Sequence, residues 1–349
     1  MPKREQLVDL LEELTALNGP SGHEDAVRAA IMAHIADHAE CKVDALGNII
    51  AFKKGKERPA CQLMLDAHMD EVGVMITSIR ADGLLCFATV GGITPESLLG
   101  KTVRFDRAEG VIGCTPIHLL EGDQKDNMPA VDKMYIDIGA DDRAEAETLV
   151  APGDVGTFIS RFVRFGDGFI KAKAIDDRAG CAVLIDMICR DQPYDMTFTF
   201  STREEVGLVG AKTVAAQVAP DVALVLESTT AGDTVGSAAG NQVCVLGQGT
   251  VLSIKDNATL YDKTLFDWIL RKANTAGIAC QVKQAVAGGN NAGAIHASGS
   301  GVRTAALSLP CRYLHSASSV IAEKDLFVTA RLASHLANEI CAGRLEPLV

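Results

Sequence analysis

The sequence predicts an α/β protein: a mostly parallel sheet flanked by helices, interrupted by an inserted small β-barrel or sandwich domain. After residue 170, strand-like and helix-like segments alternate, which is typical of a parallel sheet covered on both faces. From residue 70 to 165, short strand-like runs alternate with turns rich in Gly, Pro and Asp, and helical periodicity is scarce. We therefore predict one discontinuous domain, residues 1–69 and 166–349, with residues 70–165 inserted into it.

The segment before the insert is expected to form two helices followed by strands. Four leucines recur at helical spacing between residues 7 and 14, and the turn sequence NGPSG ends this pattern. A second helix is expected from about residue 24 to 39. Two strands are predicted in CKVDALGNIIAFKKG, and a buried strand is predicted in LMLDA.

The later elements follow the same division between a strand-rich insert and a region of alternating strands and helices. Inside the insert, LLCFATV, KTVRFD, GVIGCTP and MYIDIGA are strand-like, and only ADDRAEAETLV is helix-like. Beyond the insert, strands are expected in FIKAKA, MTFTFST, DVALVLEST and RTAALSLP. Helices are expected in CAVLIDMICRD, VGLVGAKTVAAQVA, TLFDWILRKANTAG and EKDLFVTARLASHLANEIC. Helices between strands are what a parallel sheet needs for its crossovers.

Composition indicates a globular chain of roughly two domains, since 48% of its 349 residues are hydrophobic and 22% are charged. The 45 acidic and 33 basic residues give a net charge of −12, which repels phosphate backbones and anionic membranes. We therefore expect no nucleic-acid or membrane partner. The N-terminal MPKREQLVDLLEEL has no apolar secretory core, and the ten cysteines form no C-x-x-C pair. These features predict a cytoplasmic protein with reduced cysteines.

Acidic residues and histidines stand where predicted strands end, which is where open α/β sheets build their sites. His68 and Asp70 follow LMLDA two residues apart, so their side chains point the same way. Asp70 can accept a hydrogen bond from one imidazole nitrogen while the other nitrogen binds a metal. The pair also fits an ordinary surface contact. Asp176 and Asp177 open a helix after FIKAKA, and they fit either helix caps or a carboxylate that bridges two cations.

Further candidates follow the next strands. Glu204 and Glu205 end TFTFS, and neighbouring glutamates can point apart, one binding a metal and the other acting on its water. Solvated glutamates at a helix start would look the same. Glu227 comes directly after five apolar residues, where an unpaired carboxylate is costly, although nearby Asp233 could serve instead. His315 follows RTAALSLP. Repetition at five strand ends predicts a metal centre, and these ligands suit Zn²⁺ or another divalent first-row ion.

The sequence motifs of other enzyme classes are absent or incomplete in this chain. The chain has no G-x-S-x-G nucleophile elbow and no Walker A motif, and GQG at residues 247–249 lacks the third glycine of a dinucleotide fingerprint. Three functions stay open on these residues alone. The same metals could serve N-acyl amino acid deacylation or carboxypeptidase chemistry. Glu204 and Glu227 could be the carboxyl pair of a glycoside hydrolase. The chain could also be a non-catalytic assembly protein.

Seven segments, in this order, resemble the M42 family of metallopeptidases, the tetrahedral (TET) and glutamyl aminopeptidases: AHMDEVG, YIDIGA, AKAIDDRAG, TREEVGLVGA, LESTTAGD, GGNNAGAI and PCRYLHS. The resemblance covers nearly the whole chain. It implies the zinc-peptidase fold, in which a small β domain for dimerisation and oligomerisation interrupts the α/β catalytic domain. It also implies short peptides as substrates, and dimers that assemble into a twelve-subunit homo-oligomer.

The resemblance implies two divalent metal ions per subunit, with Zn²⁺ preferred and Co²⁺ or Mn²⁺ also suitable. The implied metal ligands are His68, Asp176, Glu205, Glu227 and His315. Among these, Asp176 resembles the bridging ligand and is expected to join Asp177 through a cis peptide. Glu204 resembles the general base that activates water between the metals, and Asp70 resembles the orienting partner of His68. The expected reaction removes the N-terminal residue of a short peptide.

The chain departs from the family pattern at two places. The family usually has aspartate at the position of Glu227, so the extra methylene changes the reach of this carboxylate. Asn290 and Asn291 stand where the family commonly has Thr-Asp, and this removes a negative charge near the site. These departures leave the preference for the first residue of the peptide open.

Overall fold

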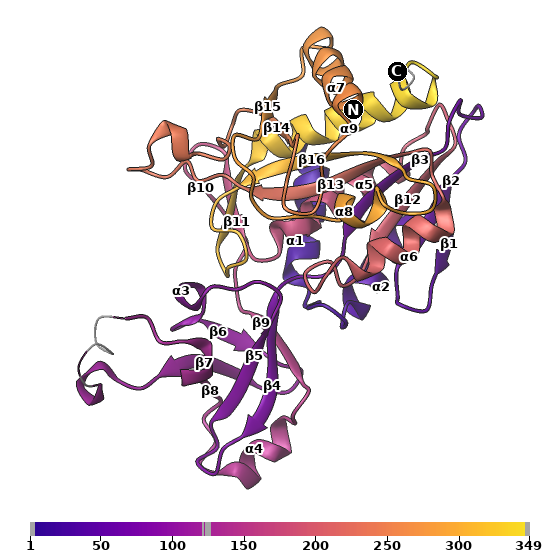
Figure 1. Ribbon diagram of the computed structural model, residues 1–349. Coiled ribbons are helices and arrows are strands. Elements are labelled where there is room, and N and C mark those ends of the chain that lie inside the picture. The colour runs from indigo at the N-terminus through magenta and orange to yellow at the C-terminus, as the bar shows by residue number, and fades with distance from the viewer. Residues whose placement is uncertain (1–3, 121, 123–126, 346–349) are drawn as a thin grey trace.

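The computed structural model describes residues 4–120, 122 and 127–345. Figure 1 shows two parts, a helix-covered sheet and, below it, a barrel formed by the stretch from β4 to β9. The sheet has eight strands in the order β1-β2-β12-β3-β13-β16-β14-β15. In that order the strands are Glu40–Val43, Ile49–Lys53, Met196–Ser201, Leu63–His68, Val222–Thr230, Arg303–Cys311, Thr250–Leu252 and Cys280–Val282.

The four central strands β12, β3, β13 and β16 run parallel, whereas β2 and β14 join them antiparallel. The mostly parallel sheet predicted from the alternation of helices and strands is therefore confirmed. Parallel neighbours bring the carboxyl ends of β12, β3 and β13 to the same edge. The strand predicted in DVALVLEST is β13, which includes Glu227 and ends at Thr230.

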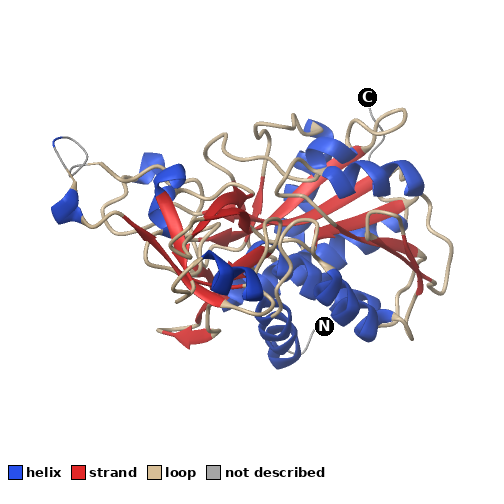
Figure 2. Ribbon diagram, turned by 90° about the horizontal axis from the view of Figure 1, so that it is seen from below, coloured by secondary structure: helices blue, strands red, loops and turns tan. Residues whose placement is uncertain are grey.

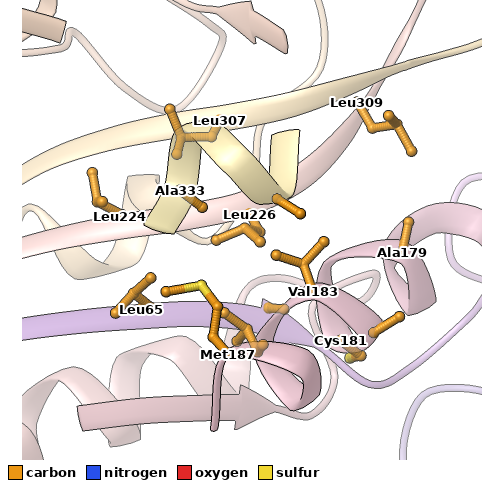
Figure 3. Close-up of a cluster of buried hydrophobic side chains, with 14 of the residues drawn as sticks. Leu65, Ala179, Cys181, Val183, Met187, Leu224, Leu226, Leu307, Leu309 and Ala333 are labelled. Carbon is orange, nitrogen blue, oxygen red and sulfur yellow. The ribbon is translucent and has the colours of Figure 1, made fainter. Parts of the chain in front are cut away.

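Helices cover both faces of the sheet, as Figure 2 shows. They are α1 (Arg4–Ala16), α2 (Asp25–Ile35), α5 (Ile175–Ile188), α6 (Val209–Val218), α7 (Lys263–Thr275), α8 (Ala292–Ile295) and α9 (Glu323–Cys341). Alternate residues of each strand serve opposite faces, because successive side chains point to opposite sides. Leu65 of β3 packs with α5 and α9, whereas Met64 packs with α6 and α8. Figure 3 shows the first face, where Leu65 and Leu224 lie near Met187 of α5.

The second part is a closed barrel with the strand order β4-β5-β8-β7-β6-β9. Its strands are Gly73–Ile79, Leu85–Val90, Met134–Asp137, Glu109–Cys114, Thr102–Arg104 and Val155–Phe158, in that order. Val74, Ile76, Leu85, Val103 and Ile136 are among the buried residues that fill it. The structure thus confirms a small barrel interrupting the α/β fold. The predicted division at residues 69/70 and 165/166 stays a prediction.

Short elements complete the fold. The helix-like run ADDRAEAETLV forms α4 (Arg143–Leu149), whose N-cap Asp142 accepts a hydrogen bond from the backbone N–H of Glu145 at 2.9 Å. The sequence did not indicate α3 (Pro95–Leu98), which is too short to show helical periodicity. The strands β10 (Val163–Phe165), β11 (Phe169–Ala172) and β17 (Ser319–Ala322) form a separate small sheet. No helix in the described part of the chain has the length and apolar character needed to cross a bilayer.

Candidate metal centre

His68 is the last residue of β3, and its side chain is 1% exposed. Its Nδ1 lies 3.1 Å from the backbone oxygen of Asp70 and 3.3 Å from Oδ1 of the same residue. The backbone carbonyl can only accept, so Nδ1 carries the proton and Nε2 is left with a lone pair. Nε2 faces two other carboxylates, with Asp176 Oδ1 at 3.4 Å and Glu227 Oε1 at 3.3 Å.

Asp70 is fully buried and joins three parts of the chain. Its Oδ2 accepts hydrogen bonds from Ser21 Oγ at 2.6 Å and from the backbone N–H of Glu205 at 3.1 Å. Its Oδ1 accepts from the backbone N–H of Glu204 at 3.0 Å. Burial disfavours the charged form of Asp70, but His68 and these donors outweigh it and lower the pKa of the carboxyl. An ionised Asp70 therefore orients His68 and the Glu204–Glu205 turn together.

Asp176 stands at the start of α5, joined to Asp177 by a cis peptide. Its φ of −82° and ψ of 108° are not helical, and Ala174 before it has a φ of 52°. This backbone directs the two oxygens of Asp176 to different histidines: Oδ1 lies 3.4 Å from His68 Nε2, and Oδ2 lies 3.3 Å from His315 Nε2. Asp177 instead accepts a hydrogen bond from the backbone N–H of Gly180 at 2.9 Å, in the first turn of α5.

Glu204 and Glu205 follow β12 on a turn in which Arg203 has a φ of 55°. The carboxylate of Glu205 reaches His315, with Oε1 at 3.2 Å from Nε2. Glu204 lines the adjoining cavity. Burial, with the nearby charges of Glu205 and Asp176, raises the pKa of Glu204 to about 8, although His68 opposes this shift. Both glutamates line this cavity, and they differ in that the Glu205 carboxylate contacts His315.

Glu227 points from β13 into the same cluster and is 6% exposed. Its Oε2 is buried and makes no hydrogen bond to the described residues. Burial, with the negative charges of Asp176 and Asp177, raises the pKa of Glu227 well above its usual range. Asp233, the sequence alternative to Glu227, is instead paired with Arg312, with Oδ1 at 2.6 Å from Nε.

His315 comes from the loop after β16 and has a φ of 55°. Its Nδ1 lies 2.8 Å from the backbone oxygen of Gly92, so Nδ1 is the protonated nitrogen and Nε2 faces Asp176 and Glu205. Arg203 and Tyr313 also have left-handed backbone conformations. Such conformations are uncommon for residues with side chains and often cluster at functional sites.

All five sequence-predicted ligands therefore lie together. Ligand atoms of His68, Asp176 and Glu205 lie within 4.8 Å of one another, as do those of Asp176, Asp177 and Glu227. Buried carboxylates repel one another unless cations balance them, and Asp176 Oδ1 and Glu227 Oε2 have no hydrogen-bond donor among the described residues. Histidines whose Nε2 atoms converge with carboxylate oxygens are the donor set that a divalent cation requires. The site fits a metal.

A cavity of about 270 Å³ opens onto this cluster. Its lining adds residues that the sequence did not indicate, among them Gly92 and Lys283. Nothing in the local sequence marks either residue, and Ser21 appeared only as part of a turn. A larger cavity of about 550 Å³ lies elsewhere and is lined by Asn18, His23 and Arg104, among others, but by none of the predicted ligands.

The sequence model of the M42 glutamyl aminopeptidase family matches residues 47–332. A putative aminopeptidase of Acetivibrio thermocellus is 37% identical over 97% of this chain and 100% of its own length. The glutamyl aminopeptidase of Lactococcus lactis subsp. cremoris is 32% identical over 89% of this chain and 90% of its own. A solved structure of the TET1 peptidase of Pyrococcus horikoshii, described as able to assemble into a tetrahedron or a large octahedral shell, is 33% identical with a TM-score of 0.83. It covers 95% of this chain, which covers 99% of it.

Proposed function

Because this chain belongs to the M42 family of aminopeptidases, it is a peptide-bond hydrolase, and we propose that it removes N-terminal residues from short peptides with two divalent metal ions. The observation that carries the proposal is the placement of Asp176. Its Oδ1 faces His68 at 3.4 Å and its Oδ2 faces His315 at 3.3 Å. One carboxylate between two histidines is suited to bridge two cations.

We assign His68, Asp176 and Glu227 to one ion, and Asp176, Glu205 and His315 to the other. The distances support this grouping, since Glu227 Oε1 lies 3.3 Å from His68 Nε2 and Glu205 Oε1 lies 3.2 Å from His315 Nε2. The side chain of Glu227 is one methylene longer than aspartate, and its carboxylate lies within the cluster. Imidazole and carboxylate ligands without thiolate suit Zn²⁺, and also Co²⁺ or Mn²⁺.

Cations bound at this centre would supply Lewis acidity, which polarises the peptide carbonyl and activates water near neutral pH. Glu204 would act as the general base. It lines the cavity beside the ligands, and burial raises its pKa to about 8, whereas bound cations would lower it toward neutrality, where the carboxylate can accept a proton. The Glu204 carboxylate would take a proton from the attacking water and return it to the amine that leaves. Asp70 would hold His68 in its metal-binding tautomer and fix the backbone of Glu204.

The alternative reactions are not favoured. The family assignment points to aminopeptidases and not to deacylases, carboxypeptidases or glycoside hydrolases. A glycosidase needs two carboxyl groups on opposite sides of the scissile bond. Glu227 instead lies among histidine and aspartate side chains, which suits a metal ligand better than a free acid.

The test uses Glu204→Gln, which keeps the size of the side chain but cannot accept a proton. We expect this variant to bind metal like the wild type and to lose aminoacyl chromogenic substrate turnover by about 10²–10⁴-fold. Normal turnover would refute the base assignment. The same substrates with a blocked amine serve as controls, and faster cleavage of the blocked form would favour a deacylase. Polysaccharide hydrolysis that survives chelation would favour a glycosidase.

Lys283 supports a preference for an acidic first residue. It lines the cavity beside Glu227, and its Nζ donates to the backbone oxygen of Ala287 at 2.6 Å. Its Nζ forms no ion pair with any described residue, and the described lining contains no arginine or other lysine. A half-buried ammonium with free donors attracts a carboxylate. The relative from Lactococcus lactis subsp. cremoris is named for glutamyl substrates, which agrees with this preference.

Substrates that start with Glu, Leu and Lys test the preference. We expect kcat/KM to be highest for Glu, and Lys283→Met to lower it for Glu alone by about tenfold or more. Lys263→Met is a matched control, because this exposed lysine at the start of α7 pairs with Asp267. A wild-type preference for Leu or Lys would contradict the assignment of Lys283.

We also propose that the barrel, within the predicted insert 70–165, mediates homo-oligomerisation of dimers into a dodecamer. The support is the P. horikoshii TET1 peptidase, whose assembly into a tetrahedron or octahedral shell is reported with its structure. Light scattering with size-exclusion chromatography tests the proposal, and a stable monomer at micromolar concentration would refute it.

A further inference from the structure

The loop that carries His315 lies between the sheet and the barrel. Residues 312–318 connect β16 to β17, yet Ala317 belongs to the buried apolar cluster of the barrel. The backbone oxygen of Ala317 accepts a hydrogen bond from Ser160 Oγ at 2.6 Å, and Ser160 follows the last barrel strand, β9. Ala317 therefore contacts the barrel through both its side chain and its backbone oxygen.

The barrel also touches the metal centre directly. The segment that leaves β5 places the backbone oxygen of Gly92 2.8 Å from His315 Nδ1. The preceding Gly91 has a φ of 81°, and a Cβ at this position would lie 2.9 Å from Val72 Cγ1 and 3.2 Å from Glu205 Cβ. Only a glycine fits so close to Glu205 with this backbone. The two glycines thus contact two side chains of the centre.

These contacts are one-sided. Gly91 and Gly92 lie against Glu205 and His315, which we assigned to one ion. In the other half of the centre His68 contacts Asp70, which accepts hydrogen bonds from Ser21 in the N-terminal turn and also from the backbone N–H of Glu205.

A buried ion cluster fixes the root of the barrel, where the chain passes between the sheet and the barrel. The chain leaves the sheet through Glu71 and returns through Lys173, and Lys173 Nζ lies 2.7 Å and 2.9 Å from the two oxygens of Glu71. Arg178 Nη2 lies 3.4 Å from the same carboxylate, and its Nε donates to the backbone oxygen of Met69 at 2.8 Å. Glu71, Lys173 and Arg178 are 2%, 3% and 0% exposed. Both crossings are thereby tied to α5.

We propose that the barrel positions one ligand of the metal centre. The backbone oxygen of Gly92 sets the tautomer of His315, and the contact between Ser160 and Ala317 sets the position of the His315 side chain. Loss of the contact between Ser160 and Ala317 weakens binding of the ion assigned to Asp176, Glu205 and His315. Binding of the ion assigned to His68 is unchanged. This proposal rests on the ligand assignment of the proposed function. Ser160, Ala317 and Gly91 are positioning residues, since none of them reaches a metal.

The experiment measures metal bound per chain by mass spectrometry across a series of buffered free Zn²⁺ concentrations. His315→Ala first identifies which of two binding steps belongs to His315. Ser160→Ala is then expected to weaken that step, about 10–100-fold as for other partners that orient a metal ligand, and to leave the other step unchanged. Ser160→Thr keeps the hydroxyl and should restore binding. Ser78→Ala, on an exposed part of β4, is the matched control and should change neither step.

The outcomes separate the two proposals. Equal weakening of both steps by Ser160→Ala, or no change in either, would overturn the role of the barrel. Wild-type protein that binds a single ion, or His315→Ala with unchanged binding, would instead overturn the ligand assignment. Gly91→Ala adds a second perturbation of the same half, and circular dichroism checks that it folds. If Gly91→Ala does not fold, Ser160→Ala alone decides.

Discussion

Asp66 is a fully buried carboxylate on β3, two residues before His68. It accepts hydrogen bonds from Thr199 Oγ1 at 2.6 Å, Asn291 Nδ2 at 2.8 Å and Ser201 Oγ at 3.2 Å. Burial disfavours its charge more than these donors favour it, so the pKa of Asp66 rises from 3.8 to about 6. The folded chain therefore favours the protonated acid in a range where the unfolded chain has lost the proton.

We expect Asp66→Asn to stabilise the metal-free protein at about pH 8, with a gain that vanishes as the pH falls to about 4. Between the two pKa values the folded wild type holds the extra proton, so its stability falls as pH rises through this window. A shift of roughly two pKa units corresponds to about 3 kcal/mol, which is the upper limit of the gain. The introduced amide can be satisfied, because Asn291 Oδ1 is buried with no hydrogen-bond partner among the described residues and can accept once the Asn291 amide turns.

The assay is urea unfolding of the chelated protein from about pH 5 to pH 8, with wild type and variant compared at each pH. Thr199→Val is the second arm, since it removes a donor to Asp66 while keeping the shape of the side chain. It should raise the pKa of Asp66 further and steepen the loss of stability with pH. A difference between Asp66→Asn and wild type that stays constant across the range would refute the reasoning.

Other outcomes test the rest of the structure. Lys173→Met leaves the buried Glu71 with Arg178 alone and should lower the free energy of unfolding by about 3–5 kcal/mol in urea; a change below about 1 kcal/mol would show that the ion cluster does not fix the barrel root. Chelation should lower Tm and added Zn²⁺ should restore it, because a ligand of the folded state alone stabilises that state; an unchanged Tm would contradict the metal centre. Glu227→Ala should lose one metal equivalent by mass spectrometry, and Glu227→Asp should keep both; full occupancy in the alanine variant would remove Glu227 from the ligand set.

The sequence predicted the sheet because its strands leave strong local signals. VALVL is apolar throughout and LMLDA is apolar except for Asp66, and each is followed by a polar residue at the sheet edge, His68 in the first case. Parallel pairing then brings strand ends together without any need to know side-chain angles. This is why the five candidate ligands could be named, while their roles stay predictions.

Other parts of the site leave no such signal. Gly92 contributes a backbone oxygen, which every residue possesses, and its contact with His315 depends on where the barrel sits. Lys283 is one lysine among many until the fold places it in the cavity. The strand predicted in DVALVLEST ends one residue before β13 does, at Thr230; Ser228 and Thr229 are polar but buried, so polarity alone does not mark the end of the strand.

The ion cluster at the root of the barrel limits where the chain could be cut. New termini between residues 69 and 72 would separate Glu71 from its backbone pairing with Gly19 and would release His68. Circular permutation is better tolerated at exposed turns with few contacts. The turn around Val235 and Gly236 is fully exposed and lies outside the cluster. A permuted enzyme opened there should fold and bind metal, whereas one opened at the crossing should lose both properties.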